Sequence, residues 1–253
     1  MLTFTSAQLE AWIWAGLWPF LRILALFTAA PLLGHRSVPQ RLKVALAAAI
    51  TLVVAPGLEP APAGADPLWL LAQQLAIGLA IGLCLQLIFS AFEVAGDLLG
   101  LQMGLSFASF IDPQHAEQSP IVGTFLGLLA TLVFLAMNGH LMMIAGIAET
   151  FRTLPLGAPA PSIGDWRGLA QLGAGLFRIG LHVALPVLTT MLVINLGLGV
   201  LARAAPQLNL MAVGFPATIL IGLAALGLSL PLLGPFLEST LSQGLATAFS
   251  LGK

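Results

Sequence analysis

Long apolar runs dominate this chain. A helix needs about 20 apolar residues to cross a bilayer, so the run lengths predict an all-α membrane protein of about six long hydrophobic helices. Short Pro-rich linkers separate some of the runs, which favours helical hairpins within one domain. The expected helices cover Leu9–Leu33, Val44–Ala55, Leu68–Leu105, Ile121–Ala148, Ser162–Arg203 and Leu210–Leu237, followed by a mildly amphipathic tail at Glu238–Lys253.

Two of the expected helices do not match the thickness of a bilayer. Arg41 and Lys43 start the second helix, but its uninterrupted apolar part, Val44–Ala55, covers only about 18 Å of a hydrocarbon core of about 30 Å. Leu68–Leu105 is too long for a perpendicular span. Pro186 lies inside another run and should kink that helix. These features suit a subunit packed within a hetero-oligomeric helical assembly better than a free-standing bundle.

Small residues precede a polar break in the middle of the chain. Gly96, Gly100 and Gly104 recur every four positions and predict a helix face that another backbone can approach closely. The periodicity is then lost over Phe107–Pro120, where an Asp-Pro pair disfavours helix. Lipid cannot satisfy the backbone groups of such a segment, so we expect it at a lumen, a gate or a buried interface.

A second polar break follows the fifth expected helix. Pro206, Gln207 and Asn209 lie together there, between two long apolar runs. Each half of the chain therefore contains an apolar helix, a compact polar turn with Pro, and a second apolar helix. We interpret this as a hairpin pattern that the two halves share.

Composition agrees with a membrane-embedded chain. Hydrophobic residues make up 58% of the sequence and charged residues 8%, and the mean hydropathy is +1.01. The net charge of -1 and the scattered basic residues exclude a broad nucleic-acid surface. The sequence contains no metal-ligand spacing and implies no cofactor, and Cys84 is expected to be a buried thiol.

Several charged residues lie in segments that we expect to be buried, and buried charges need partners. Ion pairs between helices or between subunits are the favoured interpretation, with a charge that lines a passage as the alternative for Arg22. The residues are Arg22, Arg178 and Arg203, against Glu93, Asp97 and Glu149. Glu93 and Asp97 share one helix face, and the alternative for this pair is a proton or cation site.

The densest group of basic residues lies between the first two expected helices. His35, Arg36, Arg41 and Lys43 fall within nine positions. The positive-inside rule places such a cluster on the cytoplasmic side of a membrane. The Pro-rich linker Gly57–Pro67 is expected on the opposite side.

Four segments carry a more specific pattern. They are Ala95–Pro113 (AGDLLGLQMGLSFASFIDP), Asn138–Leu141 (NGHL) with Phe151–Gly157 (FRTLPLG), Ala184–Val187 (ALPV), and Asn195–Pro216 (NLGLGVLARAAPQLNLMAVGFP). In order, spacing and total length they resemble the flagellar biosynthetic protein FliR family and its type III secretion counterparts. The resemblance covers essentially the whole chain.

This resemblance implies an export-gate subunit in the bacterial inner membrane, at the flagellar basal body. It implies FliP-like and FliQ-like neighbours, a docked FlhB-like subunit, an FlhA-like protein nearby, and unfolded polypeptides as the exported cargo, with membrane lipid around the assembly. It further implies that residues 1–160 pack like FliP and that residues 161–253 form a FliQ-like hairpin.

The family's pore-plugging loop carries over, by resemblance, onto Ser106–Ser119. Its apolar members would close a lumen while its polar members keep the loop wettable. The residues concerned are Ser106, Phe107, Ser109, Phe110, Ile111, Asp112, Pro113, Gln114, His115 and Glu117.

Three functions compete on the sequence alone. The first is a non-enzymatic gate subunit, which would work by steric exclusion of water and ions. The second is a proton- or cation-coupled secondary transporter that uses Glu93 and Asp97. The third is a membrane-embedded hydrolase, but the Ser and His residues show no catalytic spacing, so no catalytic residue is expected.

Overall fold

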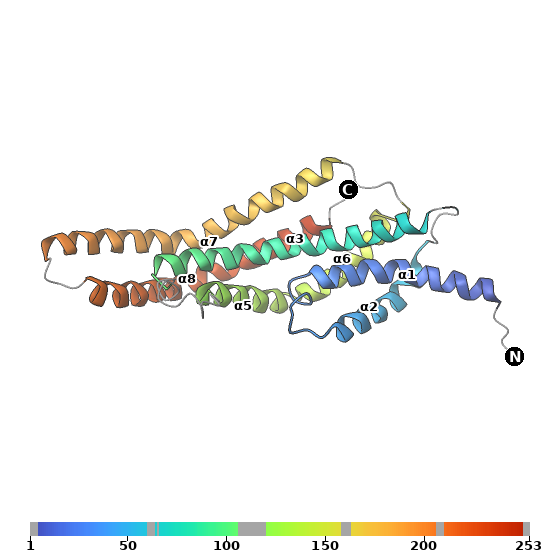
Figure 1. Cartoon of the computed structure of the whole chain (residues 1–253), viewed down its shortest axis with the longest axis horizontal. Coiled ribbons are helices and arrows are strands. Elements are labelled where there is room, and N and C mark those ends of the chain that lie inside the picture. Colours follow the sequence, from blue (N-terminus) through green and yellow to red (C-terminus); the bar gives the residue numbers. More distant parts are fainter. Residues whose placement is uncertain are drawn as a thin grey trace. The chain divides into compact units, whose positions relative to one another are not determined.

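Most of the described chain is helical. The computed structural model describes residues 5–59, 64, 66–105, 120–157, 163–205 and 210–249. These residues form seven α-helices and one 3-10 turn, and none of them lies in a strand (Figure 1). The predicted all-α class is confirmed.

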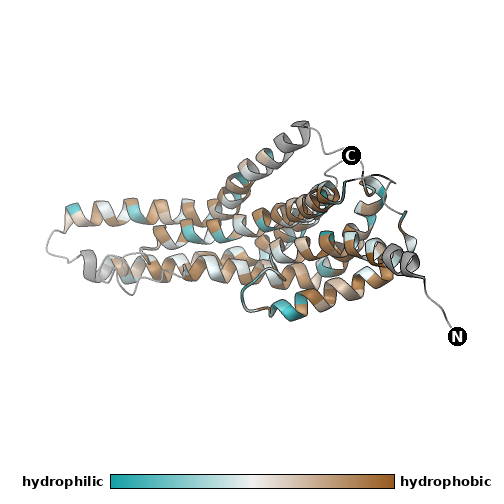
Figure 2. Ribbon diagram, turned by 45° about the vertical axis from the view of Figure 1, so that its right-hand side comes forward, coloured by the Kyte–Doolittle hydropathy of each residue, from teal (hydrophilic) through white to brown (hydrophobic). Residues whose placement is uncertain are grey.

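The helices follow the apolar runs of the sequence, with differences at a few ends. Their bounds are α1 (Ser6–Ala29), α2 (Gln40–Val54), the 3-10 turn η1 (Ala55–Gly57), α3 (Pro67–Gln102), α5 (Ile121–Ala136), α6 (Gly139–Thr153), α7 (Ile163–Ala204) and α8 (Leu210–Phe249). Hydrophobic residues extend along most of these ribbons (Figure 2).

Five helices of the described chain are long and apolar enough to cross a membrane, and the α5–α6 pair makes a sixth if it counts as one span. This agrees with the predicted membrane protein. The second helix extends beyond the apolar stretch Val44–Ala55 at both ends, because α2 begins at Gln40 and η1 continues it to Gly57, giving 18 residues. The expectation that this helix is too short to span is therefore wrong.

The fourth apolar run forms two helices instead of one. α5 ends at Ala136, α6 begins at Gly139, and the two helices are bent by 69°. Asn138 lies between them with a φ of 57°, a left-handed conformation that Asn tolerates better than most residues. An α-helix cannot continue through this conformation, and the apolar pattern gives no sign of it.

Proline affects the two C-terminal helices in different ways. Pro186 has no N–H to donate to the carbonyl of His182, and α7 is bent in its middle (Figure 1). α8 runs without interruption to Phe249, so the expected sixth helix and the expected tail are one element. This helix nevertheless contains Pro216, Pro231 and Pro235.

The chain divides into two compact units, to which α3, α7 and α8 each contribute a part. Unit 1 comprises Met1–Leu87, Asn138–Leu172 and Ser242–Lys253, and unit 2 comprises Ile88–Met137 and Gly173–Leu241. In unit 1, α1 packs closely on α3, because a Cβ added at Gly82 would lie 2.5 Å from the Ala29 Cβ and 3.0 Å from the Leu26 carbonyl oxygen. Cys84 is buried, as predicted.

Candidate functional site

Both polar breaks lie outside the described residues. Residues 106–119 hold every residue predicted for the pore plug, and residues 206–209 hold Pro206, Gln207 and Asn209. The structure therefore describes the helices that flank these segments. No group of three or more His, Cys, Asp or Glu side chains in the described part of the chain could hold a metal ion.

α3 and α5 touch backbone to backbone close to the central break. Gly96 of α3 lies against Gly123 of α5, and a Cβ added at Gly96 would come within 2.5 Å of the Gly123 nitrogen and 2.6 Å of the Val122 carbonyl carbon. Real Cβ atoms do not approach backbone atoms this closely, so only glycine fits at this point. The two helices that flank residues 106–119 are thereby joined at a fixed place.

The other two glycines of the predicted stripe have different surroundings. A Cβ at Gly100 would lie 4.0 Å from Val122 Cγ2, which is an ordinary contact. Gly104 has a φ of 81° and donates its N–H to the Leu101 carbonyl at 3.1 Å. The next amide, of Leu105, donates to the Gly100 carbonyl at 3.0 Å, which completes a Schellman cap. Gly104 therefore ends α3, a role that its spacing did not predict.

Replacing Gly104 by Ala should destabilise the protein by about 1 kcal/mol, because a Cβ disfavours the left-handed conformation. Gly104→Asn should be milder, since Asn tolerates this conformation. Thermal unfolding of the purified protein in detergent measures both effects. Equal melting temperatures for the Ala variant and the unaltered protein would contradict the cap.

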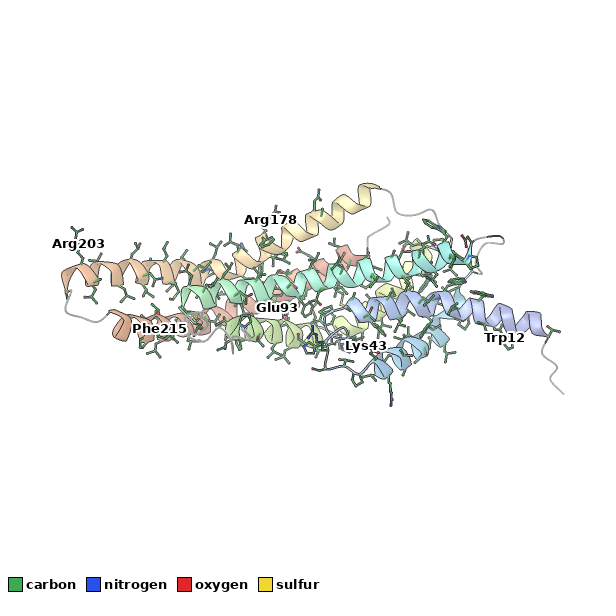
Figure 3. All side chains as sticks on the ribbon, in the orientation of Figure 1. Trp12, Lys43, Glu93, Arg178, Arg203 and Phe215 are labelled. Carbon is green, nitrogen blue, oxygen red and sulfur yellow. The ribbon has the colours of Figure 1, made fainter. Side chains whose placement is uncertain are left out.

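The two carboxylates of α3 lie over the glycines of α5. Asp97 Oδ1 faces Gly123, and a Cβ at Gly127 would lie 3.2 Å from Glu93 Cγ and 3.4 Å from Glu93 Oε1. Glu93 is exposed (labelled in Figure 3), whereas Asp97 Oδ1 is buried without a hydrogen-bond partner among the described residues. An oxygen in this position can accept a proton or a hydrogen bond from a donor outside the described residues.

Arg22 is fully buried in unit 1 and uses all three nitrogens of its guanidinium group. Nε donates to Gln74 Oε1 at 2.7 Å and Nη2 donates to the Leu154 carbonyl at 2.9 Å. Nη1 donates to the Thr150 carbonyl at 3.0 Å and to Thr150 Oγ1 at 3.2 Å. The Phe151 ring centroid lies 4.1 Å from the guanidinium carbon. These partners are all uncharged, so the favoured ion pair of Arg22 is not found in the described chain.

The reason is that the end of α6 supplies the counter-charge. Carbonyl groups at a helix C-terminus carry the negative end of the helix dipole. The Thr150 carbonyl also accepts the Leu154 amide at 2.8 Å. Arg22 of α1 reaches two such carbonyls and one amide side chain of α3. The polar pair Gln73-Gln74 inside an apolar run is the sequence feature that could have indicated an uncharged partner for Arg22.

The other predicted buried cations lie on the surface of the single chain. Arg178 and Arg203 are exposed on α7 (Figure 3), and neither has an ion-pair partner among the described residues. Glu149 is 3.7 Å from Arg152, three residues along the same helix, and both are exposed. Neither side chain is buried within the single chain, because the described residues do not cover this face of α7. Their contact with another subunit stays a prediction.

α8 holds the end of α3 through residues that sequence analysis did not select. The hydroxyl of Thr218 donates to the Met103 carbonyl at 3.2 Å. A Cβ at Gly222 would lie 2.6 Å from Met103 Cγ and 2.9 Å from Met103 Cε. Within unit 2, α3 is thus held against α5 at Gly96 and against α8 at Met103. Both contacts lie at the C-terminal end of α3, shortly before residue 106.

The fold and these contacts define a class of protein, an α-helical membrane protein with five or six apolar spans in its described residues. A model of the family described as "Bacterial export proteins, family 1" matches residues 13–244. "Flagellar biosynthetic protein FliR" of Pectobacterium carotovorum subsp. carotovorum is 45% identical over 249 residues, which are 96% of this chain and 94% of the relative. The protein of the same name from Escherichia coli (strain K12) is 43% identical with the same coverage, and that of Bacillus subtilis (strain 168) is 31% identical over 80% of each chain.

The chain therefore belongs to the FliR family of bacterial export proteins. The resemblance that four sequence segments indicated is confirmed.

Proposed function

We propose that this chain is a non-enzymatic subunit of the flagellar export gate in the bacterial inner membrane, where it forms part of the entrance of the secretion channel. Its relatives are named flagellar biosynthetic proteins and its family is described as bacterial export proteins. Its neighbours in this proposal are FliP-like, FliQ-like and FlhB-like subunits, with an FlhA-like protein nearby. Unfolded polypeptides are the cargo.

The length of the apolar helices is the observation that carries the proposed assembly. The apolar windows Pro67–Gln102 and Gly214–Phe249 have 36 residues each. At 1.5 Å per residue such a window is about 54 Å long, against a hydrocarbon core of about 30 Å. Fitting it by tilt alone would take about 56°, beyond the range of about 0–40° for membrane helices. Apolar surface outside the core is best covered by neighbouring proteins.

Incomplete burial of these helices within the chain points the same way. Only 22% of the apolar windows of α7 and α8 are buried inside the chain. We assign the cover to neighbouring subunits, with residues 1–160 packing in the manner of FliP and residues 161–253 in the manner of FliQ. Arg178 and Arg203, exposed on α7, would then meet carboxylates of these subunits.

A pore-plugging loop at Ser106–Ser119 completes the proposal. Its support is that both flanking helices are held, α3 against α5 at Gly96 and Gly123, and α3 against α8 at Met103. A segment whose two ends are fixed can obstruct a passage and be displaced by cargo while the helices stay in place. Its phenylalanine and isoleucine side chains would exclude water and ions from the constriction.

Deleting Ser109–Glu117 should raise ion conductance through the complete export complex, because the apolar constriction is removed while the anchored helix ends remain. Conductance is measured in planar bilayers with the complex formed from all coexpressed partners, and native mass measurement verifies that assembly is intact. Replacing Phe107, Phe110 and Ile111 together by Ser should raise conductance without shortening the chain. An intact complex with unchanged conductance in both variants would overturn the plug.

A further inference from the structure

Three cations follow one another closely in sequence where α1 leads into α2. Arg36 and Arg41 are exposed, and Lys43 is 8% exposed. None of their side chains has an ion-pair or hydrogen-bond partner among the described residues, and the sequence has no Asp or Glu from Ala11 to Leu58. This part of unit 1 therefore carries positive charge that the chain does not compensate.

The turn that carries these cations has a defined local structure. The amide of Ser37 donates to His35 Nδ1 at 3.2 Å, and the amide of Val38 donates to the His35 carbonyl at 3.1 Å. The amide of Leu42 donates to the Pro39 carbonyl at 3.0 Å as α2 begins. Arg36 and Arg41 are therefore presented from an ordered turn and the first turn of a helix.

Lys43 is the least ordinary member of the group. It shares the buried face of α2 with Ala47 and Thr51, and lysine is seldom nine-tenths buried unless it is paired. Lys43 has no hydrogen-bond partner among the described residues, yet its ammonium nitrogen is not one of the fully buried polar atoms there that lack a partner. The ammonium therefore reaches the surface of the described chain. A helical side chain leans toward the N-terminus of its own helix, which for Lys43 is the turn that bears Arg36.

The rest of α2 is apolar and largely uncovered. Its start is hydrophilic and its remainder hydrophobic in Figure 2, and only 11% of its apolar window is buried inside the chain. The exposed side chains are Leu42, Val44, Leu46, Leu52 and Val53. An uncompensated cationic end on an exposed apolar helix is complementary to a molecule with an anionic head and apolar tails.

We propose that the α1–α2 turn and the start of α2 bind the headgroup of an anionic phospholipid, with Arg36 and Arg41 at its phosphate and Lys43 as a third cation on the other face of α2. The planar guanidinium of Arg matches the oxygens of a phosphate, and basic residues beside a membrane helix attract anionic lipid. The exposed apolar side chains of α2 lie along the acyl chains. Neither a free phosphate ion nor an acidic peptide would account for that apolar face, so lipid is the favoured occupant.

The test measures binding of fluorescent phosphatidylglycerol to the export complex purified in detergent. The double variant Arg36→Gln, Arg41→Gln should bind it about tenfold more weakly, since the two cations at the phosphate are lost while both positions are exposed and leave the fold intact. Binding of phosphatidylcholine, which has no net charge, should not change. The control is Arg152→Gln, which removes an exposed arginine elsewhere in unit 1 and should bind like the unaltered protein.

A second variant tests the buried cation. Lys43→Arg should retain phosphatidylglycerol binding and Lys43→Met should weaken it, with thermal stability measured for both. The proposal is overturned if the Arg36 and Arg41 double variant binds phosphatidylglycerol normally, or if the control loses binding equally. Displacement of the lipid by inorganic phosphate alone would indicate a small-anion site, and loss of a partner subunit without loss of lipid would indicate a protein contact. Neither result depends on the plug.

Discussion

Replacing Arg22 by Met should lower the thermal stability of the protein more than replacement of any exposed arginine. The Met side chain fills the space of the aliphatic stem but donates nothing. Gln74 Oε1 and the Leu154 carbonyl would then lose the donor that the structure provides, whereas the Thr150 carbonyl would keep the Leu154 amide. Leaving two buried acceptors unsatisfied costs about 3–5 kcal/mol in total, judging by broken buried polar pairs in other proteins.

Replacing Arg22 by Lys tests the positive charge separately from the planar geometry of the guanidinium group. Lys keeps the positive charge, but its single ammonium cannot reach three acceptors on α3 and α6 in a planar fork, so Arg22→Lys should fall between Met and the unaltered protein. Arg203→Met serves as the matched control, because Arg203 is exposed. The measurement is the fraction of protein that stays monodisperse in detergent after heating, since membrane proteins often unfold irreversibly. If Arg22→Met and Arg203→Met melt alike, the Arg22 network has no stabilising role.

The helices could be predicted because burial in a membrane leaves a strong signal in the sequence. Long apolar runs with few charges gave the type and order of the helices, and five of them meet the criteria for a span. The break between α5 and α6 was missed because it depends on the backbone dihedrals of Asn138. The continuity of α8 was missed because Pro231 and Pro235 suggested an end, yet both are exposed and the helix continues to Phe249.

The partners of the charged residues could be predicted less well. Sequence analysis paired Arg with Asp and Glu by sign, but Arg22 is held by carbonyl groups and an amide. Every residue carries a carbonyl, so a sequence cannot show which of them a distant arginine will meet. Exposure of Arg178 and Arg203 could not be foreseen either, because an apolar helix looks the same whether its own chain, lipid or another subunit covers it.

The glycines of α3 also show that sequence spacing does not reveal which residue makes a close contact. They allow two alanine substitutions to be compared directly. Spacing alone made Gly96 and Gly100 equivalent. A Cβ at Gly96 would meet backbone atoms of α5 at 2.5–2.6 Å, whereas a Cβ at Gly100 would meet one methyl group at 4.0 Å. Gly96→Ala should therefore destabilise the protein by about 1–3 kcal/mol or more, as overpacking does, because α5 must move away.

Gly100→Ala should instead leave stability unchanged or raise it by up to about 1 kcal/mol, since Ala favours helix over Gly. The same heating assay measures both variants, and bilayer recordings of the export complex add a second readout. Gly96→Ala shifts one of the two helices that flank residues 106–119, so in the proposed gate it should also raise ion conductance, which Gly100→Ala should not. Equal stability of the two alanine variants would show that the contact between Gly96 and Gly123 does not hold α3 to α5, and would remove the main structural support for a loop with fixed ends.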